Sequence, residues 1–332
     1  MSHPTKRILI LTTGGTIAMQ HDASLGGATP KMGAADLAAA LPPELLERVE
    51  LESDEIVNLP SSHFGLDTLW QIRQTVVEAV ARSKAERIDG VVITHGTDVL
   101  EETAILLDLT VDSPKPVVLT GAMRTATQVG YEGFANLAAA VRVAASPGAR
   151  DLGALVVMND EVHAARYVTK MHTLNVNTFQ SPAWGPLGRV EGDRVLIGGR
   201  VARRHIHCPA LETRVELFKL TVGAEPAALE DALARGVRGI VIEALGGGRI
   251  PPWWFPAIKR AIAAGVTLVA ASRCPSGRLW DSYGYPGAVR DAVAAGCLLA
   301  EGLNGQKARI KLMVVLGASG KRDEIERLWY ET

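Results

Sequence analysis

The stretch Arg7-Ile-Leu-Ile-Leu-Thr-Thr-Gly-Gly-Thr16 decides the fold class. The residues from Arg7 to Leu11 form a short aliphatic run, which is typical of a strand buried on both faces of a parallel sheet. Two threonines and two glycines follow, so the chain is expected to turn tightly where the strand ends. The same order, a buried strand followed by a turn of small residues, recurs along the first half of the chain.

Further strands of this kind alternate with segments of helical periodicity. Buried strands are predicted over 90–94, 116–120 and 154–158, and helices over 102–109 and 134–145. Another helix is indicated by apolar residues that share one face, namely Leu66, Leu69, Ile72, Val76, Val77 and Val80. This alternation predicts an α/β fold with a mostly parallel sheet flanked by helices.

The pattern changes near Arg189 and then resumes. A β-hairpin with a glycine-containing turn is predicted over 189–197, and the polar, aperiodic segment that follows indicates a connection. Further strands are predicted over 217–222, 239–243 and 266–271, with helices between them and a helical end from Arg322. We therefore expect a larger N-terminal catalytic α/β domain, a linker and a smaller C-terminal α/β domain, over 1–197, 198–213 and 214–332.

Composition excludes several classes of function. The chain has 332 residues, 47% of them hydrophobic, and a formal net charge of −1. This length fits two domains of roughly 150 residues, and the balanced charge gives no reason to expect nucleic-acid or membrane partners. No apolar run approaches the roughly 18 residues of a membrane span, and the start of the chain does not look like a secretory leader. A cytoplasmic protein is the default expectation.

The cysteines give no sign of a disulfide framework or a metal site. Cys208, Cys274 and Cys297 are odd in number, far apart, and without a CxxC spacing. We therefore expect neither a zinc site nor structural disulfides.

Polar and small residues cluster where the predicted strands of the first domain end. Because the carboxyl ends of parallel strands share one edge of a sheet, and ligands bind at that edge, these clusters are expected to meet around one crevice. The alternative is that they are only the turn residues that any α/β protein needs. The clusters are Thr13–Thr16, Asn58–Ser62, Thr94–Asp98, Thr120–Arg124 and Asn159–Asp160.

Thr16 is the first candidate for chemistry. The glycines before it bring backbone N–H groups close to a ligand, and a hydroxyl at this place is a candidate nucleophile. The competing interpretation is that Thr16 is the N-cap of a helix. The segment is neither GxGxxG nor a Walker loop, so a phosphate site has weak support.

Thr97 and Asp98 form the second candidate group. They place a hydroxyl beside a carboxylate at the expected crevice. Alternatively, Asp98 and Glu101 have the spacing of a capping box, which is purely structural. His95 is interpreted as a structural residue that bonds within the turn.

Lys170 is the third candidate, at the end of an irregular stretch. A single lysine is usually a solvated surface group. If Lys170 faces the crevice, its amine can activate a threonine hydroxyl, but only as the neutral amine, and a neighbouring Asp98 carboxylate opposes that form.

Taken together, these segments resemble the bacterial-type L-asparaginase and glutaminase family. The motifs occur in the family's order over nearly the whole chain, and the ordered set is far more specific than any one motif. The wider family also includes amidotransferase subunits that release ammonia. The matching segments are Thr13–Ala18, His95–Asp98, Glu101–Thr103, Gly121–Arg124, Val157–Asp160, Val168–Lys170 and Gln306–Arg309.

The resemblance implies a mechanism based on threonine. Thr16 would attack the side-chain amide and form an acyl-enzyme, which water then hydrolyses. Thr97, Asp98 and Lys170 would form the second constellation, which activates a nucleophile or water, with Asp98 also holding the substrate ammonium.

The resemblance also implies the groups that bind substrate and the assembly. Ser61 and Ser62 would hold the α-carboxylate and α-amino groups, and backbone amides near Gly15 and Thr97 would stabilise the oxyanion. No metal or organic cofactor is implied. The family usually forms tetramers built from tight dimers, so a homo-oligomer is expected.

The chain departs from the family pattern in two places. The family carries a tyrosine in a mobile lid after the first motif, but the corresponding segment 19–33 has none, and the first tyrosine of the chain is Tyr131. We hypothesise that Tyr283 or Tyr285 of a neighbouring subunit takes its place, the alternative being core packing. Arg249, where the family has a small polar residue, is a candidate to receive an acidic substrate group.

The expected function is hydrolysis of L-asparagine, or a close relative, to aspartate and ammonia. The alternatives are a catalytically weak amino-acid-binding or regulatory homologue, an amidase for a different small amide, and a nucleotide or phosphate enzyme that uses the glycine-rich loop. The expected partner is a small-molecule amide, without nucleic acid or membrane.

Overall fold

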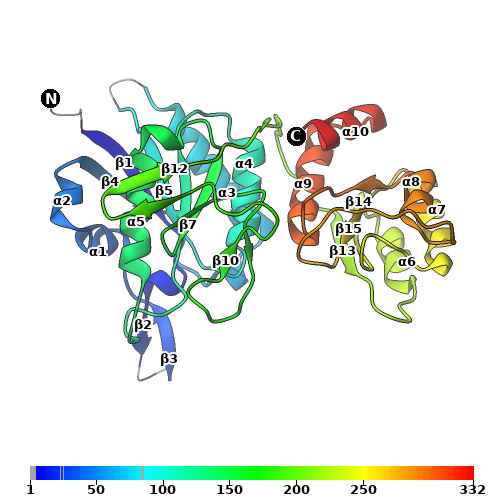
Figure 1. Cartoon of the computed structure of the whole chain (residues 1–332), viewed down its shortest axis with the longest axis horizontal. Helices are drawn as coiled ribbons and strands as arrows, with labels where there is room; N and C mark the ends of the chain where they lie inside the picture. The colour runs from blue at the N-terminus through cyan, green and yellow to red at the C-terminus, as the bar shows by residue number, and fades with distance from the viewer. Residues whose placement is uncertain (1–4, 23, 25, 84–85) are drawn as a thin grey trace. The chain divides into compact units, whose positions relative to one another are not determined.

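The computed structural model describes residues 5–22, 24, 26–83 and 86–332 (Figure 1). The chain divides into two compact units between Arg203 and Arg204. This division falls inside the segment 198–213 that the sequence predicts to be a linker.

The first unit is built on an eight-stranded sheet with the order β12-β11-β8-β7-β6-β5-β1-β4. Its parallel part confirms the predicted strands, to within a residue at either end, and adds β4: β1 (Lys6–Thr12), β4 (Val49–Glu55), β5 (Gly90–Thr94), β6 (Val117–Thr120) and β7 (Ala154–Met158). Antiparallel strands complete the sheet: β8 (Glu161–Ala164), β11 (Gly188–Glu191) and β12 (Arg194–Ile197). The last pair is the predicted hairpin.

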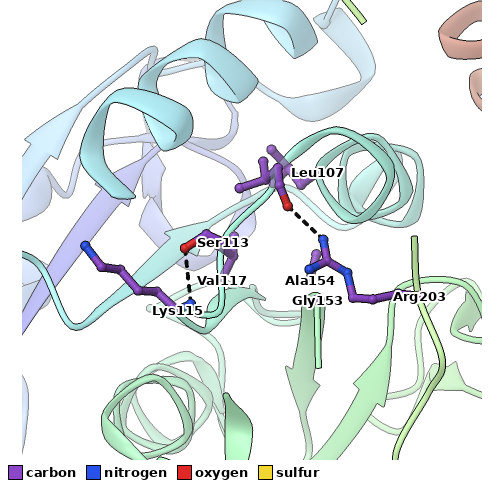
Figure 2. Close-up of a pocket in the computed structure, with 8 residues that line it drawn as sticks. Leu107, Ser113, Lys115, Val117, Gly153, Ala154 and Arg203 are labelled. Atoms are coloured by element: carbon purple, nitrogen blue, oxygen red, sulfur yellow. Dashed lines mark hydrogen bonds between the residues drawn. The ribbon is translucent and has the colours of Figure 1, made fainter. Parts of the chain in front are cut away.

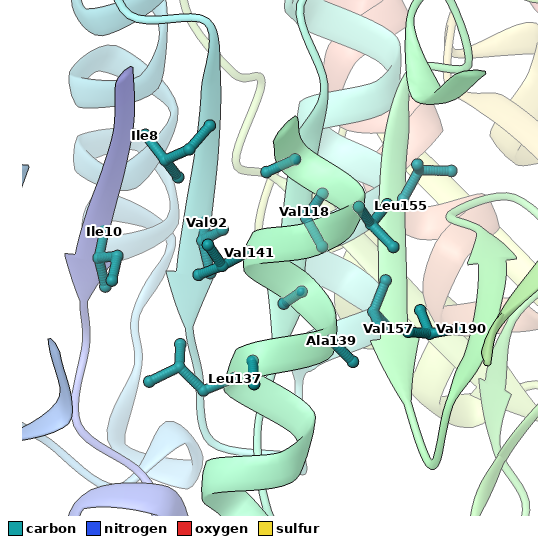
Figure 3. Packing of buried hydrophobic residues seen from close by; sticks show 14 of the residues in the cluster. Ile8, Ile10, Val92, Val118, Leu137, Ala139, Val141, Leu155, Val157 and Val190 are labelled. Carbon is teal, nitrogen blue, oxygen red and sulfur yellow. The ribbon is translucent and has the colours of Figure 1, made fainter. Parts of the chain in front are cut away.

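Helices cover both faces of this sheet because the strand residues alternate in direction. Ile8 and Ile10 of β1 pack on one face with Leu137 and Val141 of a helix (Figure 3). Leu9 of β1 belongs to the cluster on the other face. The helices are α1 (Ala34–Ala39), α2 (Pro43–Leu46), α3 (Leu66–Ala81), α4 (Leu100–Thr110) and α5 (Gly133–Ala145). Three of them, α3, α4 and α5, were predicted.

Two small hairpins of the first unit lie outside this sheet. The segment that the sequence marks as a lid forms β2 (Met19–Asp22) and β3 (Gly27–Pro30), paired antiparallel. Lys170 lies in the two-residue strand β9 (Thr169–Lys170), which pairs with β10 (Phe179–Gln180). Short polar strands of this kind carry little signal in a sequence.

The second unit has a four-stranded parallel sheet, ordered β13-β14-β15-β16. Its strands are β13 (Val215–Lys219), β14 (Gly239–Ala244), β15 (Thr267–Ser272) and β16 (Leu298–Leu299). Its helices are α6 (Ala227–Ala234), α7 (Phe255–Ala263), α8 (Val289–Ala295), α9 (Gly305–Ala318) and α10 (Arg322–Glu331). The α/β character predicted for both halves is therefore confirmed. None of the helices in the described residues is long and apolar enough to cross a membrane.

Candidate active site

The loops that follow the central parallel strands are hydrogen-bonded to one another. The backbone N–H of Thr13 donates to Thr94 O at 3.1 Å, and the Thr13 hydroxyl donates to the same oxygen at 2.9 Å. The N–H of His95 donates to Thr120 O at 2.8 Å. Three of the predicted clusters therefore meet at the carboxyl edge of the sheet.

Glycines allow these loops to approach at backbone distance. A Cβ atom on Gly15, whose φ is +81°, would lie 2.4 Å from both Cα and N of Gly96. A Cβ atom on Gly96 would lie 2.6 Å from the hydroxyl oxygen of Ser61, and one on Gly14 would lie 2.6 Å from the backbone N of Leu59. Only glycine fits at these positions, and their packing brings the loops of Thr16, Thr97 and Ser61 together.

Thr16 begins the 3-10 turn η1 (Thr16–Ala18) and is half-buried. The N-cap position of this turn belongs to Gly15. The interpretation of Thr16 as an N-cap residue is therefore wrong. The residue that follows it, Ile17, is fully buried and fixes the turn in the core of the first unit.

Lys170 joins Thr97 and Asp98. Its Nζ lies 2.9 Å from Oγ1 of Thr97 and 2.8 Å from Oδ1 of Asp98. The lysine side chain is only 18% exposed, so it is not the solvated surface group that a single lysine usually is. Thr97 is buried, whereas the Asp98 side chain is 62% exposed and is therefore accessible to a ligand.

Glu101 has a role that the sequence did not indicate. The N-cap of α4 is Val99, and no side chain caps this end of the helix, so the interpretation of Asp98 and Glu101 as a capping box is wrong. Instead, Oε1 of the buried Glu101 accepts from the Thr169 hydroxyl at 3.0 Å and from the Lys170 N–H at 3.4 Å. The carboxylate thus holds the strand that carries Lys170.

The two serines predicted to bind substrate lie in the turn η2 (Ser61–His63). Ser61 is buried, and its Oγ accepts from the N–H of Asp98 at 3.2 Å. Ser62 is exposed. Ser61 therefore fixes the backbone at Asp98, and Ser62 presents its side chain to solvent.

His95 is fully buried and bonds within its turn, as expected from the sequence, and it also bonds to Thr103 of α4. Its Nδ1 lies 2.6 Å from Gly96 O, which only accepts, so Nδ1 carries the hydrogen and donates. Nε2 lies 2.9 Å from the Thr103 hydroxyl. Burial lowers the pKa of His95 to about 4, against a weaker opposing effect of the bond to Gly96 O. The ring is therefore neutral near pH 7.

A tyrosine does reach the Thr16 turn, from outside the segment 19–33. The hydroxyl of Tyr131 donates to Ile17 O at 2.7 Å. In the sequence, Tyr131 stands out only as the first tyrosine of the chain. Its contact joins residues 114 positions apart, and no local pattern indicates it.

In the second unit, the residues expected to act in trans form one cluster. Tyr283 and Tyr285 stack with ring centroids 5.2 Å apart, and each is 49% exposed, so the alternative of core packing is wrong. The guanidinium of Arg249 lies 4.9 Å from the centroid of the Tyr283 ring. It also donates to Trp280 O at 3.2 Å.

Figure 2 shows a small hollow in the first unit, lined by residues of α4, of the segment that follows it and of the starts of β6 and β7. Its non-atom space is about 170 Å³ when open solvent is counted, but it is too narrow to hold a water molecule. Lys115 donates to Val80 O at 2.7 Å and Arg203 donates to Asp108 O at 2.9 Å, so both cations already have acceptors. The cavity contains none of the predicted site residues, and we do not regard it as the functional site.

The described residues also offer no metal centre: none of their His, Cys, Asp and Glu side chains gather in groups of three or more that suit a metal ion.

Comparison with protein families matches both units. The family model described as "Asparaginase, N-terminal" matches residues 7–202, and "Glutaminase/Asparaginase C-terminal domain" matches residues 214–329.

Individual relatives match over nearly the full chain. An L-asparaginase of Bacillus licheniformis is 34% identical over 318 residues, covering 94% of this chain and 96% of its own. A glutamyl-tRNA(Gln) amidotransferase subunit of Methanosarcina mazei is 32% identical, covering 97% of this chain and 76% of its own. The crystal structure of a probable cytoplasmic L-asparaginase from Campylobacter jejuni superposes with a TM-score of 0.87 at 31% identity, covering 99% of this chain and 100% of its own. Both matched models and these relatives agree with the motifs, and the chain belongs to the asparaginase/glutaminase family.

Proposed function

We propose that this chain is an amidohydrolase that converts L-asparagine to aspartate and ammonia, with Thr16 as the nucleophile. The observation that carries the proposal is the packing of the Thr16 turn against the His95–Asp98 loop, in which Lys170 contacts both Thr97 and Asp98. Family membership sets the reaction class, and this packing supports the assignment of roles within it.

In the acylation step, the Thr16 hydroxyl oxygen attacks the side-chain amide carbon. The C–N bond breaks, the hydroxyl proton passes to the leaving nitrogen, and ammonia departs, which leaves an ester between Thr16 and the β-carboxyl group. Backbone N–H groups near Gly15 and Thr97 stabilise the developing oxyanion. Such donors commonly contribute about 3 kcal/mol to the transition state.

In the deacylation step, a water oxygen attacks the ester carbon and the bond from that carbon to the Thr16 oxygen breaks. Thr16 takes up a proton from the water, and aspartate leaves. We assign activation of this water to Thr97 and Lys170, which lie 2.9 Å apart. Asp98 holds the substrate ammonium, and Ser61 and Ser62 fix the α-carboxylate and α-amino groups.

The assembly proposed for this chain is a cytoplasmic homo-oligomer, either a dimer or a dimer of dimers. The similarity to a probable cytoplasmic L-asparaginase of Campylobacter jejuni supports the location, and membership of the asparaginase/glutaminase family supports the oligomer. Light scattering coupled to size-exclusion chromatography tests it directly, because a monomer at working concentration contradicts the proposal.

We further propose that Tyr283 or Tyr285 of a second copy takes the place of the absent lid tyrosine, and that Arg249 lines the same site. The exposure of both rings supports this assignment. Tyr283→Phe or Tyr285→Phe is then expected to lower turnover far more than thermal stability. Unchanged turnover in both variants contradicts it.

The deciding experiment is an ammonia-release assay with L-asparagine, D-asparagine, L-glutamine and substituted amides. We expect L-asparagine to be hydrolysed best and Thr16→Ala to be inactive but folded. If no amide is hydrolysed, yet aspartate raises the melting temperature by mass action, the chain is a binding homologue. If a nucleotide stabilises it and aspartate does not, the glycine-rich loop serves a different ligand.

A further inference from the structure

We propose that Tyr131 is a positioning residue for Thr16, acting through the backbone of the turn that carries the nucleophile. The proposal rests on the function proposed above and adds a residue to it. The proposal is based on the 2.7 Å hydrogen bond from the Tyr131 hydroxyl to the carbonyl oxygen of Ile17, the residue after Thr16.

The carbonyl groups of this turn show why that bond matters. Gly15 O accepts from the N–H of Ala18, and Thr16 O accepts from the N–H of Met19. Ala18 O accepts from the backbone N–H groups of Lys31 and Met32, and Met19 O from that of Ala126. Ile17 O alone in this series has a side-chain donor, so the peptide group between Ile17 and Ala18 is held at both ends, by Gly15 O at its N–H and by Tyr131 at its carbonyl.

The Tyr131 ring is held firmly enough to act in this way. It packs edge-on against Phe134 with ring centroids 4.9 Å apart, and it borders the core cluster that includes Ile17. A Cβ atom on Gly133 would lie 2.2 Å from the Tyr131 hydroxyl oxygen, so glycine at 133 makes room for the ring. The bond therefore joins the turn η1 to the segment that leads into α5.

The phenol also remains a donor at every working pH. Burial, helped by the nearby Glu132 carboxylate, raises the pKa of Tyr131 well above its usual value. A neutral phenol donates to a carbonyl, whereas a phenolate would repel it. A second hydrogen bond connects the segment before Tyr131 to β2, the strand that follows η1: the N–H of His21 donates to the Thr127 hydroxyl at 3.2 Å.

The consequence expected is kinetic. Without the hydroxyl, the peptide group between Ile17 and Ala18 keeps only the bond from the Ala18 N–H to Gly15 O, and the adjoining Thr16 hydroxyl is held less well for attack on the amide. Small displacements of a nucleophile lower the rate of the chemical step much more than they weaken binding. In this role Tyr131 touches neither substrate nor reacting atoms.

The test compares Tyr131→Phe with Tyr330→Phe. Both substitutions remove a tyrosine hydroxyl bonded to the backbone, since the Tyr330 oxygen accepts from the N–H of Leu299 at 3.1 Å in the second unit. We expect Tyr131→Phe to lower kcat for L-asparagine about tenfold, with KM and the aspartate-induced rise in melting temperature unchanged within about twofold. Tyr330→Phe should retain wild-type kcat.

A double-variant cycle separates positioning from a general structural effect. In the Thr16→Ser background, the smaller nucleophile is held by the same turn, so Tyr131→Phe should again lower kcat about tenfold. In the Thr16→Ala background, it should not change the residual ammonia release. A wild-type kcat for Tyr131→Phe, or parallel losses of kcat, aspartate affinity and thermal stability, would overturn the proposal. Failure of the proposed function is distinguishable, because the wild-type protein would then release no ammonia.

Discussion

Gly15 and Gly96 pack backbone against backbone, so closely that a Cβ atom on Gly15 would lie 2.4 Å from Cα of Gly96. Each glycine directly precedes a threonine to which we assign a catalytic role, Thr16 or Thr97. The contact joins the ends of β1 and β5, which are neighbours in the sheet. The two threonines are thus placed by the same backbone contact, although about 80 positions separate them along the chain.

Gly15→Ala should disrupt this contact. The substitution adds a methyl group that meets the Gly96 backbone and forces alanine to a φ of +81°. We expect the free energy of unfolding to fall by about 3 kcal/mol, combining backbone strain with the clash, and turnover to be lost. Gly223→Ala is the matched control, because Gly223 has a φ of +72° but open space around its Cβ position. In Gly223→Ala the free energy of unfolding should fall by only about 1 kcal/mol, and turnover per folded molecule should be unchanged. Equal losses of stability and turnover in the two variants would show that the contact between Gly15 and Gly96 has no special role.

Lys170→Met should lower turnover by about 10²- to 10⁴-fold. The substitution removes the amine that contacts Thr97 and Asp98 and leaves a side chain of similar length. Steady-state ammonia release measures the effect. Lys115→Met, which removes a lysine bonded to Val80 O near the start of β6, serves as the control and should not change kcat. Turnover in Lys170→Met at the level of this control would remove Lys170 from the mechanism.

Glu101→Ala should reduce both stability and turnover. It removes the acceptor for the Thr169 hydroxyl and for the Lys170 N–H. The expected loss is about 1–3 kcal/mol in the free energy of unfolding, measured by urea denaturation, with a fall in kcat because β9 no longer holds Lys170. Glu78→Ala, an exposed substitution on α3, is the control and should lower the free energy of unfolding by no more than about 0.5 kcal/mol. Glu101→Ala with an unchanged kcat would show that the carboxylate does not position the lysine.

The buried His95 predicts a pH dependence of stability. Its pKa is about 4 in the folded chain, against about 6.5 in an unfolded chain. Above pH 6.5 both states are neutral at this residue. Between 6.5 and 4 the unfolded state binds the extra proton, so stability falls as the pH falls, by up to about 3 kcal/mol in total. His95→Gln should show a shallower slope of unfolding free energy against pH, by about 1.4 kcal/mol per unit near pH 5. Equal slopes would contradict a neutral, buried His95.

The core of the fold was predictable because it depends on local patterns. Buried aliphatic runs such as 90–94 and 154–158 are strands at the predicted bounds. Helix α9 was not predicted, since it is buried on almost every side and lacks an amphipathic pattern. Its lysines Lys307 and Lys311, which interrupt the apolar sequence, are 2% and 6% exposed.

The site was predictable only in part, for a related reason. The positions of Thr16, Thr97 and Lys170 follow from motifs, but their supports come from long-range contacts. Glu101 bonds to Thr169 across 68 positions, and its spacing to Asp98 suggested a capping box instead. Similarly, nothing near Tyr131 in the sequence points to Ile17, because the sheet and α5 bring them together only in the folded chain.

The central claim, that Thr16 and Thr97 act on one amide substrate, is tested most directly by ammonia release from L-asparagine in four variants. Thr16→Ala and Thr97→Val should each lose at least about 10³-fold in kcat while retaining wild-type melting temperatures. Thr16→Ser should keep measurable turnover, and Thr13→Ser, which alters the buried threonine bonded to Thr94 O, should remain close to wild type. Wild-type turnover in Thr16→Ala or in Thr97→Val would contradict the claim.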